Sequence, residues 1–427
     1  MFISRLRLVN FRSYRDVAVD FAPGLNVIVG RNASGKTNLL EGAWFALRAS
    51  SPRTSREEKA VRWGAGFARA EAVVVREAAS AGPASRTTTV GYAPGQGKQV
   101  RIDGVEVQSL DDLRRQGSAF IFVPESLLLV KGSPARRRAH LDVFGSSIDP
   151  GYAAGLRDLT AVLKQRNAQM LRVREGAGAD TLDVWDVQLA RVSLAFETRR
   201  RGLVARLAEH FAHFARGLTV EQAEFSLSLV TQLDGLTAGE EPFVAALRAR
   251  RAGEIARAVS GFGPHRDDLR FAEVVAASGE ASAESDAARA SVEQGPGALR
   301  DLRLFGSQGE QRAAVLALLL AERAVAADLT GELGPLLLDD VMSELDDTRR
   351  RLLVAALSSS GQAIVTTTNR HYFTADELDR ALVLQIGPEG PVPEGPLPDG
   401  SSRLSSASER ADDVAAEAGD ESAADDG

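Results

Sequence analysis

Short apolar runs separated by polar residues dominate the first hundred positions, and their period of two predicts β-strands. Residues 2–9 and 17–21 fit two short strands, and residues 25–29 form a mostly apolar run typical of a buried strand. Residues 40–47 then carry apolar side chains at helical spacing. Alternating β-prone segments within residues 70–107, separated by glycine and proline turns, predict a small antiparallel sheet.

The pattern becomes helical in the middle of the chain. From about Gly151 to Arg257, leucine, alanine and arginine recur at helical spacing with few glycines or prolines. This predicts a lobe of helices that are too short and too broken for a long coiled coil. β-prone residues resume near Gly263. The last third predicts, in order, a helix at 309–327, a strand at 335–339, a helix at 347–357 and a strand at 363–368.

Composition limits the kind of protein. A chain of 427 residues is long enough for two or three packed units. It has no cysteine, and its five histidines lack ligand spacing, so neither disulfides nor a zinc site is expected. No stretch approaches the roughly 20 apolar residues of a membrane span, and arginines interrupt the apolar N-terminus. We therefore expect a soluble cytoplasmic protein with no membrane partner.

Charge is unevenly distributed. The net charge is −7, but residues 387–427 contain eleven acidic residues against two arginines, so the rest of the chain is close to neutral. A near-neutral body is compatible with a nucleic-acid surface without requiring one. The acidic tail and residues 278–297, which are rich in Ala, Ser and Glu, are expected to be disordered or flexible. Lysine supplies only five of the 51 basic residues, so arginine clusters are weak indicators of a DNA surface.

A glycine-rich loop of the form G-x-x-x-x-G-K-T follows the strand predicted at 25–29 and precedes the helix. Backbone NH groups of such a loop cradle phosphates, Lys36 supplies a cation to the β and γ phosphates, and the Thr37 hydroxyl can bind Mg²⁺. The sequence therefore predicts a site for ATP and Mg²⁺. Its residues are Gly30, Arg31, Asn32, Ala33, Ser34, Gly35, Lys36 and Thr37.

A second candidate lies far downstream, where the apolar run 335–338 ends in Asp339 and Asp340. A buried strand that delivers a carboxylate beside the glycine loop provides the oxygen ligand that Mg²⁺ needs, so Asp339 is the predicted metal ligand. Asp340 is placed to polarise an attacking water. Taken alone, the run also fits a core strand ending in a capped turn.

Ser307 begins a third candidate, the segment 305–312 that heads an apolar helix. Ser307 and Glu310 together fit the S-x-x-E capping box, in which both side chains bond backbone N–H groups at the start of a helix. A helix N-terminus with a free serine hydroxyl is also an anion site. The sequence leaves both interpretations open.

Together these residues resemble the ABC-type ATPases of the SMC kind, and within that group the RecF family of bacterial recombination and gap-repair proteins. The glycine loop corresponds to Walker A, Ser307 to the signature motif, Asp339-Asp340 to Walker B and residues 344–346 to the D-loop. Further segments that carry the resemblance are 10–14, 36–41, 53–55, 122–125, 132–142, 164–167, 263–268 and 366–368.

The resemblance implies an α/β fold, namely an ABC/SMC-type P-loop ATPase head with an inserted helical lobe. The ATPase lobe is then expected to comprise residues 1–125, with Walker A, and 263–386, with the signature and Walker B. The helical lobe takes residues 126–262, and residues 387–427 form the acidic tail.

The resemblance also implies a homodimer closed by ATP, in which Ser307 of one subunit completes the site on Lys36 of the other. This dimer is expected to bind single- and double-stranded DNA at gaps and junctions, with RecR and RecO as partners, in support of recombinase loading and the SOS response. Asp340 replaces the catalytic glutamate of many ABC ATPases, which predicts a weak, DNA-dependent ATPase used as a switch. Glu310 replaces a common glutamine and adds a negative charge near a phosphate site.

Two arginine clusters, 136–138 and 199–201, are candidate contacts for DNA phosphates. For each cluster, the alternative that its arginines only form a solvated helix face has equal weight. The segment 263–268 fits either a turn with internal pairing of arginine and aspartate or a coupling element between lobes.

Two other functional classes share part of this pattern. The ATPase subunit of a membrane transporter has the loop and signature, but the Asp339-Asp340 pair and the threonines at 366–368 in place of a lone histidine argue against it. A P-loop kinase would not need Ser307 or the turn at 344–346. Release of phosphate to water, stimulated by DNA, would set the kinase aside.

Overall fold

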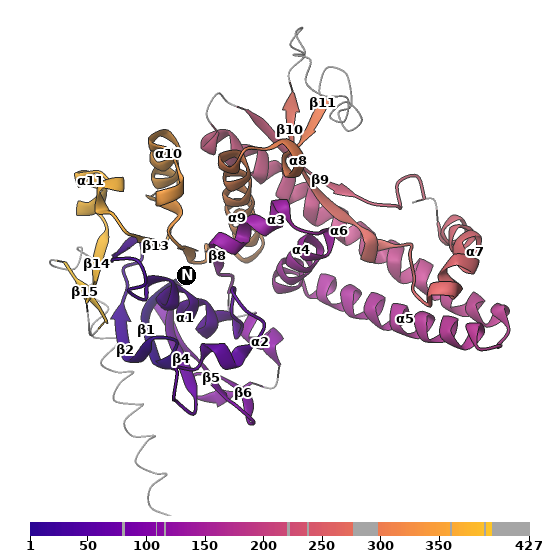
Figure 1. The fold of residues 1–427 in the computed structure, drawn as a ribbon, viewed down its shortest axis with the longest axis horizontal. Coiled ribbons are helices and arrows are strands. Elements are labelled where there is room, and N and C mark those ends of the chain that lie inside the picture. Colours follow the sequence, from indigo (N-terminus) through magenta and orange to yellow (C-terminus); the bar gives the residue numbers. More distant parts are fainter. Residues whose placement is uncertain are drawn as a thin grey trace, which may run out of the picture. The chain divides into compact units, whose positions relative to one another are not determined.

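The computed structural model describes residues 1–78, 82–107, 109–114, 117–219, 223–236, 239–275, 298–358, 361–387 and 390–394 (Figure 1). The chain forms two compact units. The first contains the chain up to Val123 and from Leu333 onward, and the second contains Pro124–Glu332. The insertion predicted at 278–297 and the acidic tail beyond residue 394 lie outside the described residues.

One sheet of the first unit is antiparallel, with the strand order β2-β1-β4-β5-β6-β7. The strands predicted at 2–9, at 17–21 and within 70–107 all belong to this sheet, so the predicted antiparallel sheet is confirmed and enlarged. Its strands are β1 (Phe2–Phe11), β2 (Tyr14–Asp20), β4 (Ala68–Ala78), β5 (Gly82–Ala93), β6 (Gly97–Ile102) and β7 (Val105–Glu106).

The other sheet of this unit has the order β15-β14-β3-β13-β12-β8, with every neighbouring pair parallel except β15 and β14. Parallel strands are covered on both faces, which explains why these strands are continuous apolar runs. The strands predicted at 25–29, 335–339 and 363–368 are confirmed, whereas three others were not predicted. The six are β3 (Leu25–Val29), β8 (Phe120–Phe122), β12 (Leu336–Leu338), β13 (Ala363–Thr367), β14 (Leu382–Gly387) and β15 (Gly390–Pro393).

Helix α1 (Lys36–Arg48) contacts strands of both sheets and lies in the core of the first unit. Gln362, directly before β13, links the two sheets. Its Nε2 donates to the carbonyls of Ile3 and Ala22, and its Oε1 accepts from the Ile3 N–H at 2.8 Å. The described part of the unit also contains the α-helices α2 (Leu110–Arg114), α10 (Asp347–Ser358) and α11 (Ala375–Asp379).

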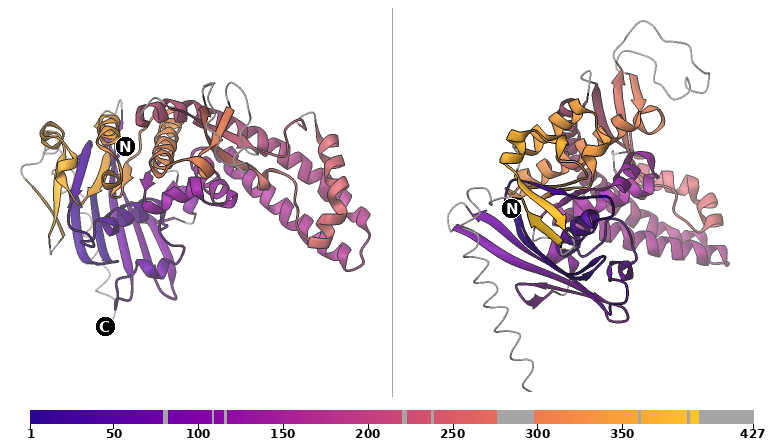
Figure 2. Two further views of the ribbon diagram at one scale, coloured as in Figure 1. Left: turned by 45° about the horizontal axis from the view of Figure 1, so that its top comes forward. Right: turned by 60° about the vertical axis from the view of Figure 1, so that its left-hand side comes forward.

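The second unit is mainly helical and also contains an antiparallel sheet of order β11-β10-β9. Its two longest helices, α5 and α6, run side by side (Figures 1 and 2). The elements are α3 (Leu128–Lys131), α4 (Pro134–Ile148), α5 (Pro150–Arg174), α6 (Asp183–Leu218), β9 (Glu224–Val230), α7 (Glu240–Arg257), β10 (Asp268–Val275), β11 (Ala298–Asp301), α8 (Leu302–Phe305) and α9 (Gln308–Thr330).

The prediction of short, broken helices is wrong, since α5 has 25 residues and α6 has 36. Charged residues that interrupt the apolar period are buried in ion pairs. Arg166 of α5 is fully buried, with Nε 2.7 Å from Asp186 of α6 and Nη2 2.8 Å from Glu254 of α7. Buried ions persist where a partner satisfies them, so these breaks in the apolar pattern do not break the helix.

The second unit extends from Pro124 to Glu332, further than the helical lobe expected at 126–262. The reason is that β9 pairs with β10, and α6 packs against α9 and β9. Residues 263–275 and 298–332, expected in the ATPase lobe, therefore pack in the unit that contains the long helices. Among the described residues, no helix combines the length and the apolar character that a bilayer crossing requires.

Candidate nucleotide-binding site

The glycine loop connects β3 to α1, and neither of its two glycines leaves room for a side chain. Gly35 takes φ 107°, and a Cβ built there would lie 2.8 Å from the Tyr14 Oη. A Cβ on Gly30 would lie 2.7 Å from the Ser34 Oγ and 3.1 Å from the Ile386 Cβ. Residues 31–33 form the exposed tip of the loop. No described side chain caps α1 and no acidic residue occupies its first turn, so its N-terminus suits an anion.

Lys36 folds back across the loop. Its Nζ donates to the carbonyl oxygens of Gly30 at 2.7 Å and Arg31 at 2.9 Å, and the side chain is buried. Burial lowers the pKa of Lys36, while Asp340 and Asp339 act in the opposite direction. The ammonium group is therefore a cation held at the loop, where a phosphate group would meet it.

Asp339, directly after β12, meets Thr37 at the start of α1. The Thr37 Oγ1 lies 3.0 Å from Oδ1 and 2.9 Å from Oδ2 of Asp339, although the two residues are 302 positions apart. Thr366 of β13 donates a second hydrogen bond to Oδ1 at 2.8 Å. The parallel order β13-β12 places these chain ends at one edge of the sheet. Burial raises the pKa of Asp339, and the two threonine hydrogen bonds partly offset this.

Asp340 adopts the left-handed conformation, with φ 46°, and its N–H donates to the Thr366 Oγ1 at 3.0 Å. Its Oδ1 is buried and has no hydrogen-bond partner among the described residues. Burial raises the pKa of Asp340, and Ser343 and then Lys36 act in the opposite direction. A carboxylate with a free oxygen and a raised pKa is suited to accept a proton from water.

Thr37 and Asp339 both offer hard oxygen ligands, and such ligands fit a divalent cation such as Mg²⁺. Among the described residues, no group of three or more His, Cys, Asp or Glu side chains could hold a metal by itself. An ion at Thr37 and Asp339 would thus complete its shell with phosphate and water oxygens, which is the usual arrangement for Mg²⁺ at phosphates.

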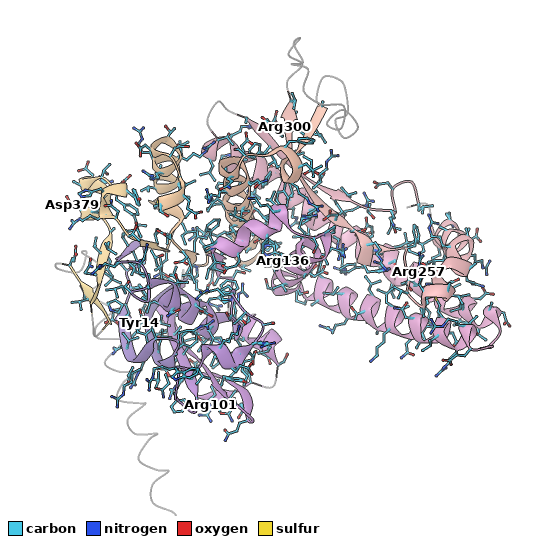
Figure 3. All side chains as sticks on the ribbon, in the orientation of Figure 1. Tyr14, Arg101, Arg136, Arg257, Arg300 and Asp379 are labelled. Atoms are coloured by element: carbon cyan, nitrogen blue, oxygen red, sulfur yellow. The ribbon has the colours of Figure 1, made fainter. Side chains whose placement is uncertain are left out.

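Sequence reasoning missed the role of two residues in this site. Thr366 forms hydrogen bonds with the Asp339 carboxylate and with the backbone of Asp340. The sequence signal that could have indicated this role is a hydroxyl residue near the end of a buried strand. Tyr14 (Figure 3) donates to the Gly35 carbonyl at 3.1 Å, and burial raises its pKa to about 12, so it remains a donor at neutral pH. No local signal connects Tyr14 to the loop.

Comparison with known proteins agrees with this geometry. A family model described as the RecF/RecN/SMC N terminal domain matches residues 2–385. The chain is 36% identical to the DNA replication and repair protein RecF of Heliobacterium modesticaldum over 391 residues, which cover 90% of this chain and 97% of the relative. The chain belongs to the RecF family.

Solved structures show the same fold. A RecF-ATP structure, described as the recombination mediator protein in the RecFOR pathway, superimposes with a TM-score of 0.74 at 24% identity, covering 92% of this chain and 97% of that one. An Smc head bound to the C-winged helix domain of ScpA superimposes with a TM-score of 0.54 at 14% identity, covering 94% and 100%. The RecF and SMC-head neighbours therefore confirm the predicted fold class, the ABC/SMC-type ATPase head.

Ser307, the residue expected to correspond to the signature motif, caps α9 in the second unit. Its Oγ accepts from the Glu310 N–H at 3.2 Å, and Glu310 Oε2 accepts from the Ser307 N–H at 2.7 Å, so the capping-box interpretation is confirmed. Arg300 Nη2 lies 3.2 Å from Glu310 Oε1 and also contacts Glu273. Glu310 is thus a capping residue with a paired charge, and an anion site at Ser307 stays a prediction.

Two of the arginines predicted to contact DNA are structural in this RecF-family chain. Arg137 is 3% exposed and bonds Asp268, while Arg200 is 1% exposed and bonds Asp142 and Asp267. Both were wrong candidates, because a buried and paired guanidinium cannot reach a phosphate. The other members are accessible to different degrees: Arg136 and Arg199 are exposed, and Arg138 and Arg201 are half-buried.

The segment 263–268 is a junction within the second unit. Asp267 and Asp268 pair with arginines of α6 and α4, and the prediction of pairing inside the turn is therefore wrong. Arg266 instead donates to the Ser260 carbonyl at 2.9 Å, and Arg138 donates to the Asp267 carbonyl. The segment fixes helices α4 and α6 to the start of β10.

Proposed function

We propose that this chain is an ATP-dependent DNA-binding protein of recombinational repair and replication, acting on single- and double-stranded DNA at gaps and junctions. The observation that carries the proposal is the contact between Thr37 and Asp339, which joins a phosphate-binding loop to a metal-binding carboxylate across 302 positions. The relatives support the DNA role, since they are DNA replication and repair proteins, and a structural neighbour is a RecF-ATP structure.

In this proposal, residues 30–37 bind the phosphates of ATP and Lys36 neutralises them. Thr37 and Asp339 hold Mg²⁺, which supplies the charge that stabilises phosphoryl transfer. Asp340 accepts the proton of the attacking water through its free Oδ1. The shorter Asp340 side chain supports slow hydrolysis, so ATP acts as a switch.

The switch is a homodimer that closes on ATP and opens after hydrolysis. Ser307 of one subunit faces the nucleotide bound at Lys36 of the other. The capping geometry supports this role, because the Ser307 oxygen accepts from the Glu310 N–H and its own proton remains free to bond a phosphate. A closed dimer encloses DNA more tightly than a monomer and couples ATP binding to DNA binding.

The cellular role that we infer is that of a recombination mediator in the RecFOR pathway, with RecR and RecO as partners. The relatives' role in DNA replication and repair supports this assignment. Recombinase loading at gaps and support of the SOS response follow from it, and the protein acts in the cytoplasm.

The test measures oligomer mass and gapped-DNA binding with and without ATP for the wild type, Lys36→Met and Ser307→Arg. Lys36→Met should lose ATP binding, and Ser307→Arg should bind ATP but fail to dimerise. Both should lose ATP-dependent DNA binding while they unfold at the wild-type temperature. Lys164→Met, at an exposed lysine of α5, is the control and should bind ATP normally. A wild type that stays monomeric with ATP at micromolar concentration contradicts the proposal.

A further inference from the structure

Trp63 presents its indole ring to solvent from a well-defined turn. Its exposed fraction is 96%, whereas tryptophan is usually a highly buried residue. The turn is closed by a hydrogen bond from the Ala65 N–H to the Arg62 carbonyl at 2.9 Å, and Gly64 takes φ 79°. The backbone that carries Trp63 is therefore held in a defined turn.

The turn is also anchored to β1. The Arg62 N–H donates to the Asn10 carbonyl at 2.8 Å, and its Nε donates to the Asn10 Oδ1 at 3.2 Å. Val61 forms an isolated β-bridge with Phe11. Phe67, directly before β4, is 46% exposed and adds a second aromatic ring to the surface. A ring on an anchored turn can bind a partner with little loss of backbone entropy.

The charge of this surface is positive. Residues 53–69 contain five basic and two acidic residues, and Glu57 is paired with Lys98. Arg56 and Lys59 are exposed, and their side chains form no ion pair among the described residues. Unpaired cations four and seven positions before an exposed aromatic ring match a single strand of nucleic acid, whose phosphates are negative and whose unpaired bases stack on aromatic rings.

We propose that Trp63 stacks on an unpaired base of single-stranded DNA, while Arg56 and Lys59 contact the phosphates of the same strand. This inference rests on the proposed function and names where the single-stranded part of a gap is held. A duplex buries the faces of its bases, so the contact is made with single-stranded DNA only. The paired residues Arg53 and Arg69 are not part of the contact.

Tryptophan fluorescence tests the contact directly, because the chain has three tryptophans and the other two, Trp44 and Trp185, are half-buried. The variant with Trp44→Phe and Trp185→Phe leaves Trp63 as the only tryptophan. It is titrated with Mg-ATP and then with oligothymidylate. We expect saturable quenching by the oligonucleotide. Quenching by Mg-ATP alone with no further change on DNA binding places Trp63 at the nucleotide's own base and overturns the inference.

Binding assays supply the second readout. Trp63→Ala should weaken binding to gapped and single-stranded DNA about fivefold to a hundredfold, the loss expected for one stacked base. Trp63→Phe should bind within about threefold of the wild type, because a phenyl ring still stacks. Val105→Ala, at a 70% exposed apolar residue of β7, is the matched control and should change nothing.

Each remaining outcome decides the question. Equal binding of gapped DNA by Trp63→Ala and Val105→Ala overturns the inference and leaves the proposed function intact. Equal losses on gapped and blunt duplex DNA also overturn it, since stacking acts on unpaired bases. A wild type that binds no DNA, with or without ATP, overturns the proposed function and this inference with it.

Discussion

The Thr366 hydroxyl donates a hydrogen bond to the Asp339 carboxylate at 2.8 Å. The same oxygen accepts the Asp340 N–H at 3.0 Å. One side chain of β13 thus holds the carboxylate of Asp339 and the backbone of Asp340, and it does so from the neighbouring parallel strand.

Thr366→Val should lower the affinity for Mg²⁺, so that ATP binding requires a higher Mg²⁺ concentration. The variant keeps the shape of the side chain but leaves the buried Asp339 with Thr37 as its remaining threonine partner. Loss of a residue that orients a metal ligand typically lowers metal affinity about tenfold to a hundredfold. Titration of ATP binding with Mg²⁺ measures the shift. Thr366→Ser retains the hydroxyl and should behave as the wild type, and equal behaviour of Val and Ser variants would refute this role.

Arg300→Gln should weaken ATP-dependent dimerisation. Arg300, labelled in Figure 3, pairs with Glu310 in the capping box of Ser307, and its removal leaves that carboxylate uncompensated beside the serine that we propose to face the nucleotide. Because the pair is partly exposed, we expect an effect of up to about fivefold. Sedimentation with ATP measures the dimer.

The matched control for this pair is Arg303→Gln, two residues into α8, where the arginine is exposed. It should dimerise normally. Glu310→Gln added to Arg300→Gln removes the uncompensated charge and should restore the dimer. A double variant as weak as Arg300→Gln would show that the charge of Glu310 is not the cause.

Arg200→Met should destabilise the second unit strongly. The guanidinium is 1% exposed and bonds Asp142, Asp267 and the Pro264 carbonyl. Breaking a buried ion pair on one side costs about 3–5 kcal/mol, because Asp267 stays buried without its arginine partner. Urea unfolding measures the loss. Arg199→Met, at the exposed neighbour, should stay within about 0.5 kcal/mol of the wild type.

The pair of His140 and Glu322 makes stability depend on pH. Burial alone would lower the pKa of His140, but Glu322, 2.7 Å from its Nε2, outweighs burial and raises the pKa. A raised folded pKa means that the stabilisation is present below the unfolded value of 6.5 and is lost as pH rises through the folded pKa. The free energy of unfolding should therefore fall in this window, and His140→Gln should remove that fall.

Glu197 also makes the free energy of unfolding fall as pH rises, but at lower pH than His140. The two effects must therefore be measured separately. Burial first, and then Asp267, raises its pKa to about 7, so its contribution is lost between its usual value of 4.5 and about 7. Glu197→Gln should flatten this lower window and leave the His140 window unchanged. If the free energy of unfolding of His140→Gln still falls above the pH window of Glu197, a group other than His140 causes that fall.

The sequence predicted the parts of the fold whose pattern is local. The strand 25–29, the glycine loop and the helix after it were predicted because apolar period, glycine spacing and helix start all lie within some twenty positions. Asp339 was predicted from the apolar run before it. Its contact with Thr37 followed from chemistry, since a phosphate-bound Mg²⁺ needs both ligands.

The sequence could not predict features that depend on distant partners. Arg137 and Arg200 look like surface arginines in a helical pattern, yet their carboxylate partners at Asp268 and Asp267 lie 131 and 67 positions away. Strand β9 was missed because its pairing partner β10 lies beyond α7, and strand β8 is only three residues long. Trp63 was missed because an exposed tryptophan and a core tryptophan have the same local sequence.

Gln362 bonds Ile3 across 359 positions, and Asp339 bonds Thr37 across 302. During translation, the first 123 residues therefore leave the ribosome long before the strands that complete their unit, whereas Pro124–Glu332 emerges as one continuous piece. The inserted unit can fold first, whereas the unit of the glycine loop can complete its parallel sheet only after the carboxyl-terminal strands have been synthesised. Truncated chains that end before Asp339 lack the carboxylate that contacts Thr37, so this site is completed only after residue 339 has been synthesised.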